Sequence, residues 1–188
     1  MGLYVHSLAE FPSGAKRNYY VYLLDYGWNE PLGEAVRANL DQMADRASRS
    51  NAAVIHGPRG VHFSDEVLSW HHINGEPADD ILPAILITTR HPKTIKESYE
   101  PKTPRSMPDD ALLLIPLKKI CSSPGEVVEL IDRIFRDIKE ERKLKNFVVA
   151  KRLHRGLGAA LVDAVILKPS MGGVGIDLKM LLSRARAE

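Results

Sequence analysis

Apolar residues recur along the chain as short runs and as helical stripes, and this alternation predicts an α/β fold. The run Arg17–Gly27, RNYYVYLLDYG, is rich in tyrosine, valine and leucine and ends at a glycine. It predicts a buried strand. An upstream run, GLYVHSLAEF, can pair with this strand as a hairpin across Pro12, Ser13 and Gly14.

A helix is expected directly after this strand. Pro31 suits its first turn, and apolar residues from Leu32 to Ala47 recur at three- and four-residue spacing, which predicts one amphipathic helix. The run NAAVIHG then predicts a second strand, closed by Gly57-Pro58 and reached by a crossover. Together these segments form a βαβ unit.

The middle of the chain is more polar. Ser64–Trp70 predicts a short helix that Ser64 can cap, and Asn74-Gly75 signals a turn. Two further strands are predicted in LPAILITTR, which Pro83 introduces, and in DALLLIPLKKI. The charged, turn-rich stretch Arg90–Asp110 between them indicates a mobile loop or a small insertion.

The clearest helix follows Ser123. Ser123 is the expected N-cap, Pro124 takes the first position and Glu126 suits the positive end of the helix dipole. Its apolar stripe is predicted to be buried and consists of Val127, Leu130, Ile131, Ile134, Phe135 and Ile138.

Past Asn146 the pattern fits a helix, two short strands or a mixture, followed by a basic amphipathic helix in IDLKMLLSRARA. We therefore expect two parts. Residues 1–145 form an α/β domain with a mixed central β-sheet flanked by helices. Residues 146–188 form a basic, glycine-containing C-terminal extension that packs on the domain or on a partner.

Composition narrows the class of protein. Of the 188 residues, 44% are hydrophobic and 27% charged, as in folded globular proteins. A single cysteine, Cys121, excludes an intramolecular disulfide and a dithiol redox pair, which favours a cytoplasmic location. No signal peptide is expected, because the N-terminus has no basic region followed by a long apolar run. No transmembrane segment is expected either, because no apolar run approaches the ~20 residues that span a bilayer.

Positive charge is concentrated in one place, although the net charge is only +2. The block from residue 142 to 155 contains no acid and carries Arg142, Lys143, Lys145, Lys151, Arg152 and Arg155. It can meet phosphates, an anionic membrane surface or an acidic protein face. Equally, it fits a solvated helix end.

The junction Trp28-Asn29-Glu30-Pro31-Leu32 resembles a motif of the thioredoxin-like superfamily, over residues 18–140. In that superfamily the first strand leads into a Trp-Cys-Gly-Pro-Cys turn that opens the first helix. A cis proline faces this turn before the third strand. Trp28 and Pro31 match the tryptophan and the proline of the motif.

Pro83 is the candidate for the cis proline, whereas Asn29 and Leu32 replace the two cysteines. The resemblance thus implies a thioredoxin-like fold without dithiol chemistry. That chemistry needs one thiolate to attack a disulfide and a second thiol to resolve the intermediate. The corner would then be retained as structure and lost as a redox centre.

Other chemistry has weaker support. His62, His71 and His72 lie in a polar segment, but adjacent side chains such as His71 and His72 diverge on any regular element, so no metal site is expected. Cys121 falls between a strand and a helix, and we expect it to be buried and inert. No cofactor is expected.

Three functions follow as hypotheses. The first is a non-catalytic, redox-inactive interaction or assembly module that binds a protein partner or a second copy of itself. Its candidate binding residues are Trp28, Asn29, Glu30, Pro31 and Pro83, with Lys143, Lys145, Lys151, Arg152 and Arg155 of the basic block.

The second hypothesis, the alternative from another class, is a small hydrolase or transferase for a phosphate-bearing substrate. It would use His71 or His72 as base and Arg59 or Arg90 as anion holder. The third hypothesis is nucleic-acid binding through residues 142–155.

Overall fold

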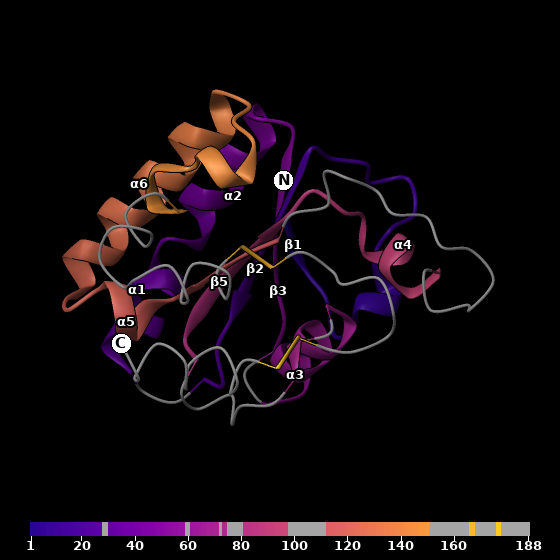
Figure 1. The fold of residues 1–188 in the computed structure, drawn as a ribbon, viewed down its shortest axis with the longest axis horizontal. Coiled ribbons are helices and arrows are strands. Elements are labelled where there is room, and N and C mark those ends of the chain that lie inside the picture. The colour runs from indigo at the N-terminus through magenta and orange to yellow at the C-terminus, as the bar shows by residue number, and fades with distance from the viewer. Residues whose placement is uncertain are drawn as a thin grey trace.

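The computed structural model describes residues 1–27, 30–58, 61–71, 73–74, 81–97, 112–150, 166–167 and 176–177. A mixed sheet occupies the centre and helices flank it (Figure 1). Its six strands are β1 (Gly2–Tyr4), β2 (Tyr19–Leu24), β3 (Ala52–His56), β5 (Ala84–Thr88), β6 (Leu112–Pro116) and the two-residue β7 (Ile166–Leu167). The α/β prediction, with a mixed central sheet flanked by helices, is confirmed.

The strands lie in the order β1-β3-β2-β5-β6-β7. β1, β3 and β2 run parallel, and β5, β6 and β7 each run antiparallel to the strand before them in this order. The carboxyl ends of β2 and β3 therefore meet at one edge of the sheet, where α/β proteins commonly place their sites.

The predicted hairpin at the N-terminus is wrong, because β1 pairs in parallel with β3 and not with β2. After β1 the chain forms the 3₁₀ helix η1 (Leu8–Glu10) instead of turning back. Leu8 and Phe11 are fully buried here. Their burial on one face of the sheet outweighs the turn signal at Pro12 to Gly14.

Helices cover both faces of the sheet. One face carries α1 (Pro31–Ala38), α2 (Leu40–Arg49) and α6 (Pro124–Lys139), and the other carries α3 (Val61–Trp70). The shorter elements are α4 (Pro92–Glu97), which packs on η1, α5 (Leu117–Ile120) and the 3₁₀ helix η3 (Leu144–Asn146). All six side chains of β2 are buried, alternating between the two faces.

The single helix expected from Pro31 to Ala47 is in fact two helices that meet at Asn39. The side-chain Nδ2 of Asn39 donates to the carbonyl oxygen of Ala35 at 2.8 Å. Asparagine side chains compete with the backbone for such bonds. The apolar spacing continues across this break, and for that reason the pattern does not reveal it.

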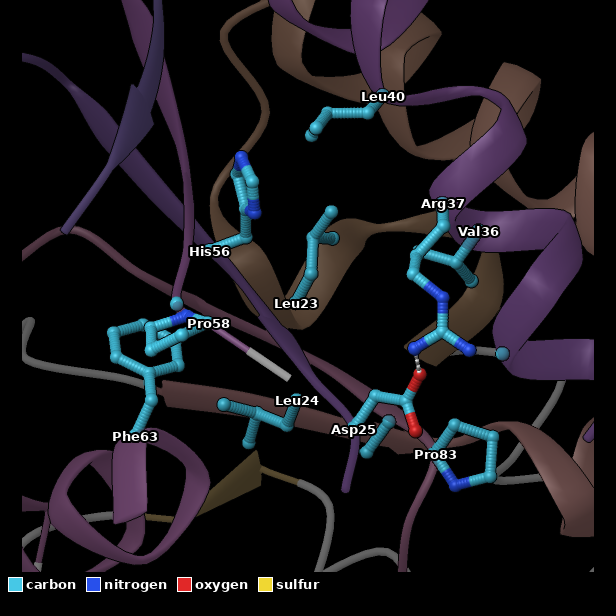
Figure 2. A pocket seen from close by; sticks show the side chains of 13 residues that line it. Leu23, Leu24, Asp25, Val36, Arg37, Leu40, His56, Pro58, Phe63 and Pro83 are labelled. Carbon is cyan, nitrogen blue, oxygen red and sulfur yellow. Dashed lines mark hydrogen bonds and ion pairs between the residues drawn. The ribbon is translucent and has the colours of Figure 1, made fainter. Parts of the chain in front are cut away.

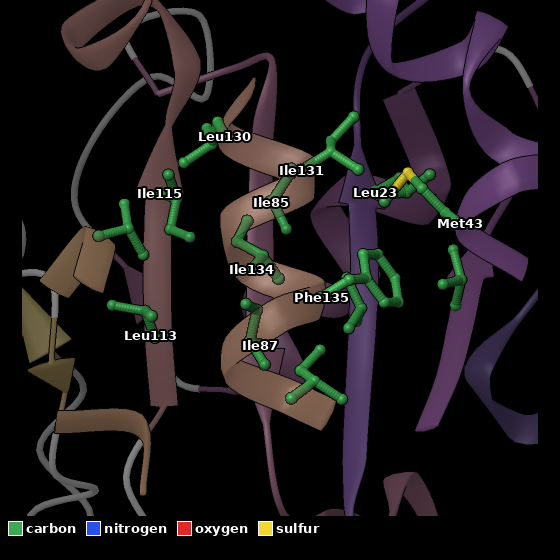
Figure 3. Close-up of a cluster of buried hydrophobic side chains, with 14 of the residues drawn as sticks. Leu23, Met43, Ile85, Ile87, Leu113, Ile115, Leu130, Ile131, Ile134 and Phe135 are labelled. Atoms are coloured by element: carbon green, nitrogen blue, oxygen red, sulfur yellow. The ribbon is translucent and has the colours of Figure 1, made fainter. Parts of the chain in front are cut away.

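The helix predicted after Ser123 is confirmed, and it is α6. The Ser123 hydroxyl accepts a hydrogen bond from the Glu126 N–H at 3.4 Å, and the whole predicted stripe is buried. Figure 3 shows α6 lying over the sheet, and Ile134 and Phe135 belong to the same buried cluster as Ile87 of β5. The strand predicted in DALLLIPLKKI is shorter than expected, because it ends at Pro116 and α5 follows.

The expected boundary at residue 145 lies inside a packed region. Phe147, Val149 and Ala150 are buried in the same core as α6, and the Phe147 ring lies 6.0 Å from the Tyr19 ring. Beyond residue 150, β7 pairs with β6, and β8 (Ile176–Asp177) pairs in parallel with β4 (Ile73–Asn74). The other residues of the predicted extension lie outside the described ranges.

Within the described ranges, no helix has both the length and the apolar character needed to cross a membrane.

Candidate functional site

A pocket opens at the carboxyl edge of the parallel strands, beside α1 and the first turn of α3 (Figure 2). Its volume is about 50 Å³, room for a small chemical group, since one water needs roughly 10–15 Å³. Most of the lining is apolar and consists of Leu23, Leu24, Val36, Leu40, Pro58, Phe63, Pro83 and Ala84. Polar side chains come from Asp25, Arg37 and His56.

Asp25, which follows β2 directly, is held from two sides. Its Oδ1 accepts the Gly27 N–H at 2.9 Å, and its Oδ2 pairs with Nη1 of Arg37. The other terminal nitrogen of Arg37 pairs with Glu34 at 2.9 Å. Gly33 permits this close approach, because a Cβ there would lie 2.8 Å from Oδ2 of Asp25. The carboxylate is thereby neutralised and oriented, not poised as a free base.

Ser64 also holds this corner, in a role that the sequence did not predict. We expected Ser64 to cap its helix, but α3 begins at Val61 and Ser64 is buried inside it. Its Oγ accepts the Asp25 N–H at 3.0 Å. One residue on, the Tyr26 hydroxyl donates to Oδ1 of Asp65 at 2.9 Å. These bonds fasten the end of β2 to α3.

Pro83 is the neighbour of Asp25 on the adjacent strand β5, which it directly precedes. The Leu82–Pro83 peptide bond is cis, as expected for this position from the resemblance. Leu24 pairs with Ala84 in the antiparallel β2–β5 ladder, which places Pro83 next to Asp25. Both residues line the pocket. The proline and the strand-to-helix corner therefore meet, although the sequence separates them widely.

The predicted residues of the corner itself are partly described. Pro31 begins α1, as expected, and Glu30 precedes it at the N-cap position. The Glu30 carboxylate forms an ion pair with Lys118 at 3.4 Å. Trp28 and Asn29 lie outside the described residues.

Of the residues predicted for phosphate chemistry, the two that the structure describes, His71 and Arg90, do not lie together. His71 is buried at the end of α3, where its Nδ1 lies 2.8 Å from the Val67 carbonyl oxygen and its ring packs on Tyr22. Arg90 follows β5, whose Thr88 pairs with Tyr20 at the start of β2. Arg90 thus lies at the sheet edge opposite the pocket.

His72 and Arg59, the other two candidates for that chemistry, lie outside the described residues. Neither His71 nor Arg90 lines the pocket.

The basic block is only partly exposed among the residues that the structure describes. Arg142 forms ion pairs with the buried Asp137 at 3.0 Å and with Glu140 at 2.5 Å, so its charge serves the fold. Lys143 and Lys145 are exposed, whereas Phe147 is fully buried. Lys151, Arg152 and Arg155 lie outside the described residues.

Cys121 is buried in the core on the α6 face, at the end of α5. It does not line the pocket, and its burial agrees with the inert role expected for it. Among the residues that the structure describes, no group of histidine, cysteine, aspartate and glutamate side chains could hold a metal ion.

His56 was not predicted as a site residue, although it follows an apolar run directly and ends β3. Its ring packs against that of Tyr4, with the centroids 5.0 Å apart, and it lines the pocket opposite Arg37 (Figure 2). Burial lowers the pKa of His56 below its usual 6.5, while a hydrogen bond with the Gly57 backbone acts in the opposite direction. His56 is therefore neutral at neutral pH.

We expect the stability of the protein to depend on this imidazole. Because folding lowers the pKa of His56, the unfolded chain binds its proton more tightly. The contribution of His56 is then complete above pH 6.5 and declines as the pH falls below that value. Urea denaturation of wild type and His56→Gln between pH 5 and 7.5, with NMR titration of the ring, measures both quantities. A titration midpoint at or above 6.5 would contradict this account.

Comparison of the chain with protein-family models, curated proteins and solved structures gives no significant match. What defines the molecule is thus its own geometry, an α/β domain with a small, mainly apolar pocket at the carboxyl edge of its parallel strands.

Proposed function

We propose that this chain is a thioredoxin-like domain without dithiol chemistry that acts as a protein-interaction module. The observation that carries the proposal is the meeting of cis Pro83 with Asp25, at the corner where β2 gives way to α1. Asn29 and Leu32 stand where the redox cysteines of that superfamily would be. The scaffold of the site is retained and its nucleophile is missing.

The polar groups of the pocket support binding more than catalysis. Asp25 and Arg37 neutralise each other, and Arg37 is further occupied by Glu34. General acid–base catalysis needs a group that is able to give or take a proton near neutral pH. The imidazole of His56 is such a group, but burial favours its neutral form, and the pocket lining around it is mainly apolar. An aliphatic side chain of a partner suits this lining.

Leu40 offers a direct test, because it lines the pocket and is only partly buried. We expect Leu40→Lys to reduce the capture of a protein partner from native lysate at least about tenfold, a loss of roughly 1.4 kcal/mol of binding free energy. Ile120→Lys is the matched control, since Ile120 is also partly buried against the same core and does not line the pocket. Capture is quantified by mass spectrometry after nuclease treatment.

Two results would count against the proposal. One is a partner that both variants retain equally, which would move the interface away from the pocket. The other is turnover of a substrate by the purified chain, which would restore the hydrolase or transferase hypothesis.

A further inference from the structure

Strand β6 is paired unequally on its two sides. On the inner side, all five of its residues pair with β5. On the outer side, the pairing that the structure describes joins β7 to Leu112 and Leu113. The sequence of β6 is LLLIP, and its first four side chains are buried. A strongly apolar strand next to a sheet edge is a ready template for another strand.

The occupant of this edge is held weakly by the backbone. β7 consists of Ile166 and Leu167 alone, and its ladder reaches only two residues of β6. Each backbone hydrogen bond contributes only modestly to net stability, because it replaces a hydrogen bond to water. A ladder this short opens at a small cost in free energy.

We propose that β6 is a strand-accepting edge and that two copies of this chain associate by exchanging β7, each placing Ile166 and Leu167 against the β6 of the other. The contacts made in the exchanged pair are the same as those within one chain, which makes such swapping a low-cost route to a dimer. The inference goes beyond the proposed function and does not depend on the pocket.

The chain is long enough for this exchange. Residues 151–165 connect the described helical turn at Ala150 to Ile166. A stretch of this length can extend to roughly 50 Å, at about 3.4 Å for each residue. That reach equals about ten strand spacings of about 4.8 Å, so β7 can pair with a strand outside its own sheet.

The test uses the full chain at concentrations up to about 1 mM, studied by size-exclusion chromatography with light scattering. Wild type should form a dimer whose fraction rises with concentration. Ile166→Pro should weaken this dimer at least about tenfold, because proline removes a backbone donor and is excluded from paired strands. Ile176→Pro is the matched control, since it interrupts the other short ladder, between β8 and β4, and should leave the dimer intact.

A synthetic peptide of residues 162–171 identifies the exchanging segment. Added in excess, it should convert the wild-type dimer to monomer. Circular dichroism verifies that each variant is folded, and Ile166→Lys, which keeps the backbone N–H, replaces the proline variant if that variant unfolds. A wild-type chain that stays monomeric, a dimer unaffected by both changes at Ile166, or a dimer that resists the peptide would each overturn the inference.

Discussion

The double variant Asn29→Cys/Leu32→Cys should gain disulfide exchange activity that the wild-type chain lacks. Leu32 lies in the first turn of α1, and Asn29 is two residues before Pro31 in the sequence. The helix dipole lowers the pKa of a thiol at such an N-terminus. A fall in that pKa from about 8.5 to about 7 raises the thiolate fraction at pH 7 about fifteenfold. The second thiol then resolves the mixed disulfide. Insulin reduction in the presence of dithiothreitol measures the gain.

The two single variants are the controls, because each has one thiol at the corner and cannot close a disulfide there. Wild type should reduce insulin no faster than the buffer, since Cys121 is buried. A folded double variant whose new thiols do not pair under mild oxidation would show that the corner differs from that of a thioredoxin-like domain. That result would leave a binding role for the pocket to be judged on Leu40→Lys.

Asp137→Ala should be the most destabilising of the charge substitutions considered, at about 3 kcal/mol of unfolding free energy. The Asp137 side chain is 1% exposed, and its carboxylate accepts the Val148 N–H at 2.6 Å and pairs with Arg142 at 3.0 Å. Its removal takes an acceptor from the part-buried Val148 N–H and leaves Arg142 with Glu140 alone as a carboxylate partner. Urea denaturation at pH 7 measures the loss.

Asp132→Ala is the matched control on the same helix. Asp132 pairs with Arg46, but the two side chains are 42% and 31% exposed, and pairs of this kind contribute at most about 1 kcal/mol. Asp137→Asn should lie between the two variants, since its amide oxygen can still accept the Val148 N–H. Equal losses at Asp132 and Asp137 would mean that the buried carboxylate does not anchor the segment after α6.

The helices and strands that the sequence predicts well are those whose local signals agree. In α6, the Ser123 cap, the proline after it and the apolar stripe all favour the same helix, and the structure contains it. All six side chains of β2 are buried, so its sequence shows no alternation of apolar and polar residues. The continuous, tyrosine-rich apolar run is then the signal that predicts this central strand.

The wrong or missed predictions concern features that depend on particular side-chain or backbone contacts, most of them between residues far apart in the sequence. The parallel pairing of β1 with β3 depends on residues that are remote in sequence, as does the hydrogen bond from Asp25 to Ser64. The break at Asn39 depends on one side-chain bond that leaves the apolar period intact. Such interactions leave no periodic trace in a single sequence.

The candidate site was anticipated in part for the same reason. The corner at Pro31 and the cis proline at Pro83 have sequence signatures, so both were predicted. Arg37 and His56 have none: each is one polar residue in an ordinary helix or strand. Only the three-dimensional register brings them to the pocket.

The antiparallel course of β5 and β6 has a practical consequence. β5 ends at Thr88 and β6 begins at Leu112, and these two residues pair with each other at the edge of the sheet opposite the pocket. Everything that the chain carries between them therefore enters and leaves on the far side of the molecule from Asp25 and Pro83. A fluorescent reporter or an affinity tag inserted between residues 98 and 111 would be joined to the sheet at the end away from the pocket, which favours this segment for immobilising the protein and observing what it binds.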